Sequence, residues 1–510
     1  MALAGTSVVV LRERAEAERA RDRVEAAGVA EQFLLAWSQR RYEDMTAITA
    51  APDDPGSAYQ RTDRRLRVRA VEAVPGPLSA DGSTVPFSVR LRLAGLGELA
   101  YDSEVHLVER RGRWQVAFSA ATLHPALDNG EQLQRRSREG PRVELADRWG
   151  TPLRAASADL AANVLGRPGT SGLERVLDAE LTSSTGGAVV VGSPRTGKEL
   201  RVLQEYRGRS GTPVRTTLDL RVQRAAEQAL AGAPSRAALV AVDTGTGEVR
   251  ATANRPVEGA AATFVAQAPG SVFKVVTATA LLQAGLTPAS PAPCPDTTSS
   301  GGRPFRNAPG TVSGPMTLAR ATAVSCNTAF LELAEGLPDG ALAAAARLYG
   351  FDDPTPLLPI ATAGGNVPEP GSTEEAAEDV IGQGRVQASP LLLASMVAAV
   401  ANGAWHRPQL LPDVEGEERP LPPGVAEPLR AMLRGVVTSG TGTAAQPPGG
   451  APVSGKTGTA QYGTGDPLPT HAWFAGWQGE LAFCVYVEDG SSGGGVAAPI
   501  ARRFLTALEP

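Results

Sequence analysis

The sequence has 510 residues and a formal net charge of -5, and hydrophobic residues occupy 42% of its positions. A chain of this length has room for about three domains, each large enough to bury its own core. The small negative charge argues against a nucleic-acid-binding protein and against a strongly basic membrane-binding surface. The four histidines are scattered without ligand spacing, so we expect neither a metal nor a cofactor.

The first 25 residues are expected to precede the first folded domain. Residues 1–11 are apolar, but a membrane-spanning helix needs about 20 such residues, and the sequence shows no complete signal peptide. Residues 12–23 alternate arginine with glutamate, aspartate and alanine. This alternation predicts a charged helix that leads into the first domain.

Residues 26–125 are predicted to form an α+β domain. Apolar residues spaced for one helix face, among them Phe33 and Trp37, predict a helix over 27–45. Alternation of apolar and polar residues predicts strands at 66–71, 84–93, 98–109 and 114–118. A long helix packed against a curved antiparallel sheet resembles the cone-like nuclear-transport-factor-2-like domain, and that resemblance implies a fold in which a pocket is possible. We find no catalytic constellation in this segment.

Residues 126–215 contain one segment that imitates a nucleotide-binding motif. Gly192, Gly197 and Lys198 have the spacing of a phosphate-binding loop, G-x-x-x-x-G-K. The next residue is Glu199, where magnesium binding needs serine or threonine and where a carboxylate repels phosphate. The following residues alternate like a strand. We therefore predict a hairpin with a Thr-Gly turn rather than a nucleotide site.

Residues 216–510 show alternating helix and strand patterns. Helices are predicted at 221–231, 271–284, 316–323, 328–333, 389–401, 429–437 and 500–508. Strands are predicted at 237–242, 248–252, 456–459, 472–476 and 481–487. The helix over 389–401 is almost wholly apolar, which indicates a buried core element.

Ser271 and Lys274 lie on one of these helices, just after a Pro-Gly turn, and their spacing puts both side chains on one face. A serine hydroxyl is a poor nucleophile until a base removes its proton. A lysine can be that base once burial and a helix N-terminus lower its pKa. The chain has three lysines, Lys198, Lys274 and Lys456, among 49 basic residues, and arginine cannot act as a base. An isolated Ser-x-x-Lys still marks a capped amphipathic helix more often than a catalytic pair.

Two downstream motifs change this balance. Ser325 and Asn327 form a Ser-x-Asn motif around Cys326, and a Lys-Thr-Gly-Thr motif follows on a predicted edge strand. The last motif consists of Lys456, Thr457, Gly458 and Thr459. All three motifs in this order are improbable by chance, so together they indicate an active site.

The three cysteines do not have the number and spacing of a disulfide framework, so we expect no required disulfide. Cys294 lies in a proline-rich loop and is expected to be exposed enough to react. Cys326 is expected to have no chemical role, and Cys484 lies in an apolar strand pattern.

The three motifs resemble the active-site elements of penicillin-binding proteins and serine β-lactamases. Further segments between 216 and 510 resemble a penicillin-binding transpeptidase domain. These are 217–223, 241–248, 382–384 and 471–476. The best match is a class B penicillin-binding protein, which lacks a glycosyltransferase domain, with a nuclear-transport-factor-2-like domain at its N-terminus.

The resemblance implies a multidomain α+β chain. Residues 26–125 would be the nuclear-transport-factor-2-like domain, acting as a spacer, and residues 126–215 a β-rich pedestal, called the dimerisation domain. Residues 216–510 would form the transpeptidase domain, an antiparallel sheet with helices on both faces and a helical subdomain. Residues 1–25 would be membrane-proximal, and 1–11 the end of an anchor helix.

The resemblance also implies roles for the motif residues. Ser271 attacks a peptide carbonyl while neutral Lys274 takes its proton. Ser325 relays a proton to the leaving amine, and Asn327 holds Lys274 and the substrate amide. Lys456 supplies positive charge near Ser325 and the substrate carboxylate.

Three further residues would bind substrate. Gly458 lets an extended substrate backbone approach the strand. The hydroxyls of Thr457 and Thr459 bind the substrate carboxylate, and the backbone N–H groups of Ser271 and Thr459 form the oxyanion hole.

The implied substrate is a peptidoglycan stem peptide that ends in D-Ala-D-Ala, and β-lactams would trap the same serine. The resemblance places the protein at the extracytoplasmic face of the cell membrane, anchored in its native form, with cell-division or elongation proteins as partners and no nucleic acid. A serine β-lactamase and a non-catalytic β-lactam sensor remain alternatives. A nucleotide-dependent enzyme would depend only on the loop at 192–198.

Overall fold

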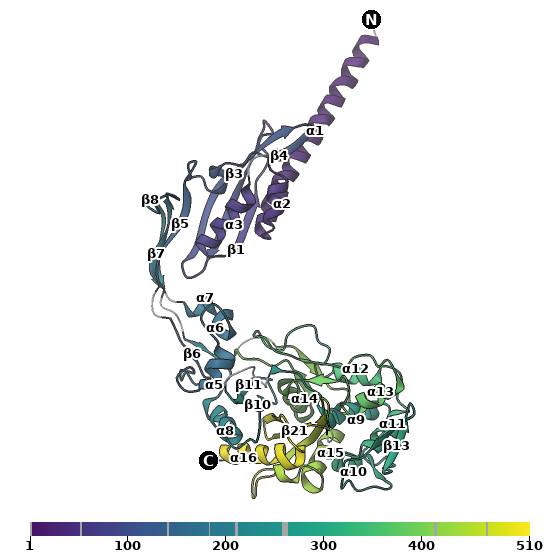
Figure 1. The fold of residues 1–510 in the computed structure, drawn as a ribbon. Coiled ribbons are helices and arrows are strands. Elements are labelled where there is room, and N and C mark those ends of the chain that lie inside the picture. Colours follow the sequence, from purple (N-terminus) through teal and green to yellow (C-terminus); the bar gives the residue numbers. More distant parts are fainter. Residues whose placement is uncertain are drawn as a thin grey trace. The chain divides into compact units, whose positions relative to one another are not determined.

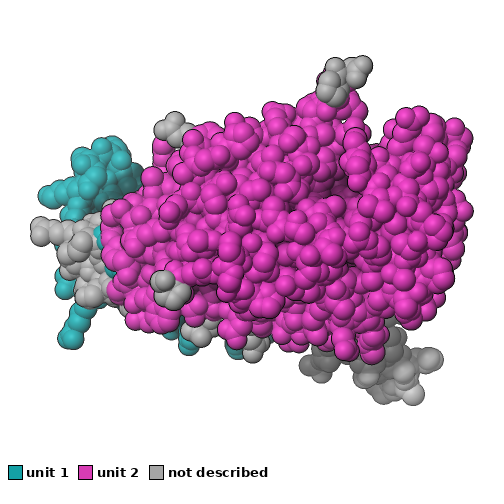
Figure 2. All heavy atoms as spheres, turned by 90° about the horizontal axis from the view of Figure 1, so that it is seen from below, with its two compact units in different colours: residues 1–143, 179–212 teal, residues 144–178, 213–510 magenta. Residues whose placement is uncertain are grey.

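The computed structural model describes residues 3–50, 54–139, 142–182, 184–209, 213–257, 264–412, 416–465 and 468–509. The chain divides into two compact units, which Figure 2 colours separately. Unit 1 comprises residues 1–143 and 179–212, and unit 2 comprises residues 144–178 and 213–510. The segment expected to be the pedestal, 126–215, therefore contributes to both units.

Unit 1 is built on an antiparallel sheet in the order β1-β2-β3-β4 (Figure 1). Its strands are β1 (Val68–Pro75), β2 (Thr84–Leu93), β3 (Gly97–Arg110) and β4 (Arg113–Val116). Every second residue of β2 is buried, because one face of the sheet is covered and the other meets solvent. The covering helices are α1 (Leu3–Ser38), α2 (Tyr42–Ala47), α3 (Pro55–Leu66) and α4 (Ala120–Leu123). Helix and sheet residues share one core that includes Phe33, Trp37, Tyr59 and Phe87.

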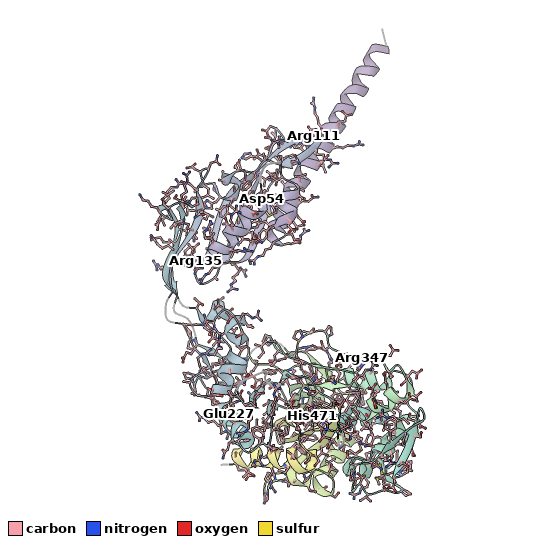
Figure 3. All side chains as sticks on the ribbon, viewed as in Figure 1. Asp54, Arg111, Arg135, Glu227, Arg347 and His471 are labelled. Carbon is pink, nitrogen blue, oxygen red and sulfur yellow. A yellow bond between two sulfur atoms is a disulfide. The ribbon has the colours of Figure 1, made fainter. Side chains whose placement is uncertain are left out.

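The helices of unit 1 differ from the sequence-based prediction in two places. The long helix ends at Ser38 rather than near residue 45, because Arg40 adopts a left-handed conformation (φ 58°) that turns the chain into α2. Helix α3 was not predicted, and because it continues to Leu66, β1 starts at Val68 rather than at residue 66. Asp54, labelled in Figure 3, caps α3 by accepting the Ser57 N–H at 3.1 Å. Within the described ranges, no helix combines the length and apolar character needed to cross a membrane.

A second antiparallel sheet completes unit 1, in the order β5-β7-β8. Its strands are β5 (Gln132–Glu139), β7 (Ser184–Gly192) and β8 (Glu199–Arg209). β7 and β8 form the predicted hairpin, with Gly197 left-handed at the turn (φ 68°). Residues 192–199, all of them described, lead from strand to strand, whereas a phosphate-binding loop leads into a helix N-terminus.

The centre of unit 2 is an antiparallel sheet in the order β11-β10-β22-β21-β20. Its strands are β10 (Ala237–Asp243), β11 (Val249–Arg255), β20 (Val453–Gln461), β21 (Thr470–Gln478) and β22 (Leu481–Val487). The third motif lies on β20, which is an edge strand as predicted. Residues 237–242 of β10 are all fully buried, so both faces of the sheet are covered.

Helices provide this cover. On one face α8 (Leu220–Leu230) and α16 (Ala498–Leu508) pack on strand residues such as Leu239 and Phe483. The predicted apolar helix, α14 (Pro390–Asn402), contacts β10, β21 and β22 and is buried along most of its length. The predicted antiparallel sheet with helices on both faces is confirmed.

A helical subdomain lies beside the sheet (Figure 1). Its helices are α9 (Lys274–Gln283), α10 (Leu318–Val324), α11 (Asn327–Ala334), α12 (Ala341–Arg347) and α13 (Thr373–Val380), and α15 (Ala426–Ser439) packs on β20 and α10. Paired short strands are β12 (Pro291–Ala292) with β15 (Met316–Thr317), β13 (Thr297–Ser300) with β14 (Arg303–Arg306), β16 (Gly365–Asn366) with β17 (Gln387–Ala388), and β18 (Ala404–His406) with β19 (Glu418–Pro420).

Residues 144–178 of unit 2 lie before the sheet in the sequence. They form β6 (Leu145–Ala146), α5 (Ala158–Leu160) and α6 (Gly172–Val176), and β6 pairs in parallel with β9 (Val214–Arg215). The short helix α7 (Asp178–Leu181) leads from this part of the chain into β7.

Candidate active site

The first motif begins with a close approach between the serine turn and the edge strand. Ser271 lies in a 3-10 turn, Gly270–Phe273, that leads directly into α9. Gly270 has a φ of 54°, and a Cβ there would lie 2.5 Å from the Thr459 carbonyl oxygen. The Gly270 N–H donates to the Gly382 carbonyl at 2.8 Å. These contacts hold Ser271 beside β20 and require glycine at 270.

Lys274 is fully buried at the start of α9, and its amine joins the first two motifs. Its Nζ lies 3.1 Å from Ser271 Oγ, 2.8 Å from the Ser325 carbonyl oxygen and 2.6 Å from Asn327 Oδ1. Burial, and then the charge of Lys456, hold the pKa of Lys274 well below its usual value. The neutral amine is therefore more populated beside Ser271 than it would be in water.

The second motif is a turn between two helices. Ser325 ends α10 in a left-handed conformation (φ 60°), a strain on the order of 1–2 kcal/mol for a residue with a Cβ. α11 then begins at Asn327. This turn aims both the Ser325 carbonyl and the Asn327 amide at Lys274.

The third motif brings the second buried lysine to the same place. Lys456 is fully buried, and its Nζ lies 2.8 Å from Ser325 Oγ and 3.0 Å from the Thr457 carbonyl oxygen. Burial lowers the pKa of Lys456 to about 7. Ser325 therefore lies between two amines of lowered pKa.

The other residues of the third motif pack against the serine turn and its neighbours. A Cβ at Gly458 would lie 2.5 Å from the Pro269 carbonyl oxygen, so the serine turn itself requires glycine there. Thr457 Oγ1 lies 2.5 Å from Thr441 Oγ1. Thr459 Oγ1 accepts the Gly493 N–H at 3.2 Å. The structure thus brings together all eight residues that the sequence analysis selected.

Sequence reasoning missed two side chains that support β20. Gln383 Nε2 donates to the Thr459 carbonyl at 3.3 Å, and Gln383 Oε1 accepts the Gln461 N–H at 3.2 Å. Thr441 contacts Thr457 as described above. The flanking glycines of Gly382-Gln383-Gly384 marked a family-like segment in the sequence, but nothing there indicated contact with β20.

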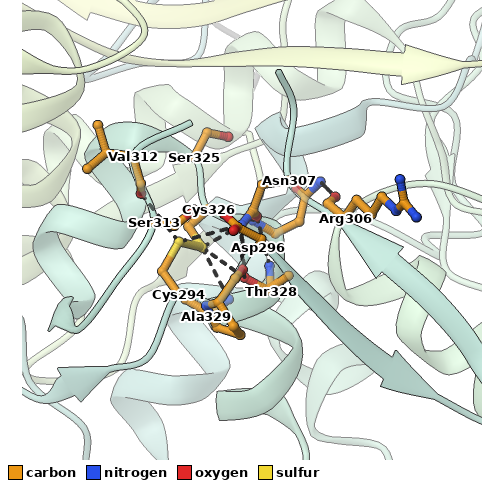
Figure 4. Close-up of a disulfide and its surroundings, with 12 residues drawn as sticks. Cys294, Asp296, Arg306, Asn307, Val312, Ser313, Ser325, Cys326, Thr328 and Ala329 are labelled. Atoms are coloured by element: carbon orange, nitrogen blue, oxygen red, sulfur yellow. Dashed lines mark hydrogen bonds between the residues drawn. A yellow bond between two sulfur atoms is a disulfide. The ribbon is translucent and has the colours of Figure 1, made fainter. Parts of the chain in front are cut away.

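The expectation about the cysteines was wrong. Cys294 and Cys326 form a disulfide (Figure 4), and both residues are buried, so Cys294 is not an exposed reactive thiol. The two residues are 32 positions apart. The prediction failed because three cysteines can contain one pair, and only the fold brings two of them together. Cys484 is free and buried in β22.

Removing this disulfide is expected to destabilise unit 2. A disulfide that closes a loop of this length reduces the conformational entropy of the unfolded chain, which raises the free energy of unfolding by about 3–4 kcal/mol. Thermal unfolding of wild type with and without reductant measures the effect. The double variant Cys294→Ala/Cys326→Ala is the control, because reductant should leave its midpoint unchanged. Equal midpoints for oxidised and reduced wild type would contradict the expectation.

The acidic helix α13 is not uniformly hydrated. From the sequence alone, Glu374, Glu375, Glu378 and Asp379 would be expected to form one face of a solvated acidic helix. Asp379 is instead buried, which raises its pKa to about 7. Glu375 pairs with Arg385 at 2.8 Å, and Glu378 pairs with Arg303. The cluster is therefore tied into the fold rather than uniformly hydrated.

Residues 237–506 match the family model of the penicillin-binding protein transpeptidase domain. The chain belongs to the penicillin-binding protein transpeptidases. Residues 25–131 match a second model, the NTF2-like N-terminal transpeptidase domain. The assignment made from the three motifs and from the cone-like pattern of the first domain is confirmed.

Named relatives and solved structures agree with this family. The peptidoglycan D,D-transpeptidase PbpA of Mycolicibacterium smegmatis is 32% identical over 405 residues, which is 66% of this chain and 79% of the relative. The structure of penicillin-binding protein A from M. tuberculosis, a ceftriaxone acyl-enzyme complex, has 26% identity and a TM-score of 0.60 and covers 73% of this chain and 99% of that one. A chain of a peptidoglycan synthase complex that coordinates polymerization and crosslinking has 30% identity and a TM-score of 0.57, with 66% of this penicillin-binding protein and 70% of that chain covered.

Proposed function

We propose that this protein is a peptidoglycan D,D-transpeptidase in which Ser271 forms the acyl-enzyme. The observation that carries the proposal is the set of contacts at Lys274 Nζ. Two short contacts go to oxygens that can only accept hydrogen bonds, Ser325 O and Asn327 Oδ1, and the third goes to the Ser271 hydroxyl.

These contacts orient a neutral lysine as a base. A neutral amine has two N–H donors and one lone pair. The Ser325 carbonyl and the Asn327 amide oxygen take the two donors, so the lone pair faces Ser271 Oγ at 3.1 Å. The Ser271 hydroxyl then donates its proton to Nζ as its oxygen attacks the substrate carbonyl.

The proton can leave by a short route. Ser325 Oγ lies 3.5 Å from Lys274 Nζ and accepts from Lys456 Nζ at 2.8 Å. We propose that Ser325 passes a proton to the leaving amine while the bond between the acyl carbon and that nitrogen breaks. The terminal D-Ala departs as a neutral amine. An amine of a second stem peptide then attacks the acyl-serine, forms the new amide and releases Ser271.

The edge strand suits an extended peptide. We propose that substrate adds alongside β20, with its carboxylate near Lys456 and the hydroxyls of Thr457 and Thr459. The backbone N–H groups of Ser271 and Thr459 would hold the developing oxyanion. Gly458 lets this strand lie against the serine turn, which keeps Ser271 next to the proposed peptide site. Asn327 would contact the substrate amide as well as Lys274.

A direct experiment tests this function. Purified protein is incubated with a donor peptide that ends in D-Ala-D-Ala and an acceptor amine, and the products are identified by mass spectrometry. Transpeptidase activity yields free D-Ala and the donor–acceptor amide in equal amounts. Free D-Ala without any amide would indicate a carboxypeptidase, and no reaction with the peptide would contradict the proposal.

The acyl-enzyme formed with penicillin is expected to persist for many minutes, with negligible turnover. A β-lactamase must activate water against the acyl-serine with a placed base, such as a glutamate in class A enzymes. Glu375 and Glu378 in α13 are engaged by arginines, which disfavours either as that base. Intact-protein mass spectrometry over time after removal of free penicillin measures the lifetime. Clearance of a large excess of penicillin would favour the β-lactamase alternative, which the comparisons do not support.

We further propose a location, partners and domain boundaries. The substrate is a cell-wall polymer, which supports a site of action at the extracytoplasmic face of the cell membrane with an N-terminal anchor. A neighbouring structure belongs to a complex that polymerizes and crosslinks peptidoglycan, which supports a glycan-polymerising partner in division or elongation. The matched families support a spacer domain near residues 26–125 and a transpeptidase domain over 216–510, with 126–215 as the pedestal between them.

A further inference from the structure

The helix that carries Asn327 has a weak cap of its own. α11 begins directly after Cys326, whose sulfur lies 3.3 Å from the Ala329 N–H and is bonded to Cys294. The first N–H groups of a helix need acceptors, and the usual ones are oxygens of serine, threonine, aspartate or asparagine. A disulfide sulfur is a poor substitute.

Asn307 supplies the missing acceptor from a different part of the chain. Its Oδ1 accepts the N–H groups of Asn327 at 2.7 Å and Thr328 at 3.1 Å. Its Nδ2 donates to the Pro295 carbonyl at 2.8 Å and to Thr328 Oγ1 at 3.0 Å. Asn307 directly follows β14, so one half-buried side chain joins this hairpin, the loop after Cys294 and the first turn of α11 (Figure 4).

The neighbouring residue holds the side chain of Asn327. Asn327 Nδ2 donates to the Arg306 carbonyl at 3.0 Å, which turns Oδ1 toward Lys274 Nζ at 2.6 Å. Arg306 thus fixes the amide, while Asn307 fixes the backbone to which that amide belongs. Both acceptors that orient Lys274 lie within this same turn, since the other is the Ser325 carbonyl.

We propose that Asn307 is a positioning residue for acylation, which acts on Lys274 through the Ser325–Asn327 turn. This inference rests on the proposed function. Without the Asn307 cap, the turn keeps its disulfide but loses the hydrogen bonds that set its position. The Lys274 lone pair then spends less time aimed at Ser271 Oγ, so the chemical step slows more than penicillin binding weakens.

The test separates rate from binding. Asn307→Leu keeps the approximate volume and removes every hydrogen bond, whereas Asn307→Asp keeps the acceptor and suits a helix N-terminus. Acylation is followed at several penicillin concentrations, which gives a limiting rate constant and an apparent dissociation constant. We expect Asn307→Leu to lower the limiting rate constant about 10- to 100-fold, since small displacements of reacting groups have effects of this size. The apparent dissociation constant should change by less than about threefold. Asn307→Asp keeps the acceptor for α11 but loses the hydrogen bond to the Pro295 carbonyl, so it should recover part of the rate.

Two controls make the result specific. Asn402→Leu is matched in chemistry, because Asn402 is an exposed asparagine that contacts His406 in another part of unit 2, and it should acylate like wild type. Asn307→Ser, whose hydroxyl is too short to reach both N–H groups, replaces the leucine variant if that variant does not fold, and it should show the same loss of rate.

The inference is overturned by an unchanged limiting rate constant in Asn307→Leu, or by Asn307→Asp as slow as Asn307→Leu. A loss confined to the apparent dissociation constant also overturns it. A failure of the proposed function looks different: wild type itself would then not acylate at Ser271, or it would give no donor–acceptor amide in the peptide assay. If wild type acylates and Asn307→Leu acylates equally fast, only the proposed role of Asn307 is overturned.

Discussion

The variant Ser271→Ala is expected to show no covalent labelling by penicillin. The substitution removes the oxygen that forms the acyl ester, and no other hydroxyl lies closer to Lys274 Nζ among the described residues. The fold should persist, because Ser271 is only half-buried and its hydroxyl contacts the Lys274 amine. Intact-protein mass spectrometry detects the adduct, and thermal unfolding checks the fold.

The matched control is Ser439→Ala. Ser439 is an exposed serine at the end of α15, where its hydroxyl donates to the Gly435 carbonyl in the preceding turn. This variant should be labelled like wild type. A penicilloyl adduct that persists in Ser271→Ala and maps to another residue would remove Ser271 as the nucleophile.

The variant Lys274→Arg is expected to acylate about 10²–10⁴-fold more slowly than wild type, the usual effect of losing a general base. Arginine keeps the positive charge but cannot accept a proton at neutral pH. The pKa of Lys274 is lowered, so in wild type the neutral amine is present above that pKa and acylation falls as the pH drops through it. The residual reaction of Lys274→Arg should lack this dependence. A rate close to wild type would show that another group is the base.

The other two lysines serve as comparisons. Lys198 lies exposed in the turn between β7 and β8, so Lys198→Arg should have no effect on acylation. Lys456 donates to Ser325 Oγ and to a carbonyl, which a guanidinium can also do. Lys456→Arg should therefore lose less activity than Lys274→Arg.

The residue types needed for the chemistry could be read from the sequence. Lys274 stood out because almost all other basic residues are arginines. Each of the three motifs also places its reactive side chains within a few residues of one another in the sequence. The alternating burial of β2 and the apolar run of α14 were also readable, because strand and helix periods depend on neighbouring residues alone. The β7–β8 hairpin followed from the same local patterns.

Other features depended on contacts between distant residues. The Cys294–Cys326 disulfide, the burial of Asp379 and the contact of Gln383 with β20 each join segments that local patterns treat separately. The requirement for glycine at 458 comes from the serine turn almost 190 positions earlier, not from the strand itself. Helix α3 was missed for a different reason, since its cap of Asp54 and Pro55 is also common in turns.

The sequence by itself determined which side chains could be nucleophile, base and proton relay, because those abilities belong to the residue type. Only the tertiary structure brings these side chains within hydrogen-bond distance of one another. It buries Lys274 and Lys456, which lowers the pKa of each. Asn307 caps α11, so that the Ser325 carbonyl and the Asn327 amide oxygen face the Lys274 amine. Burial and hydrogen-bond direction are properties of packed neighbours, and the neighbours of Lys274 come from segments more than 50 residues away along the chain.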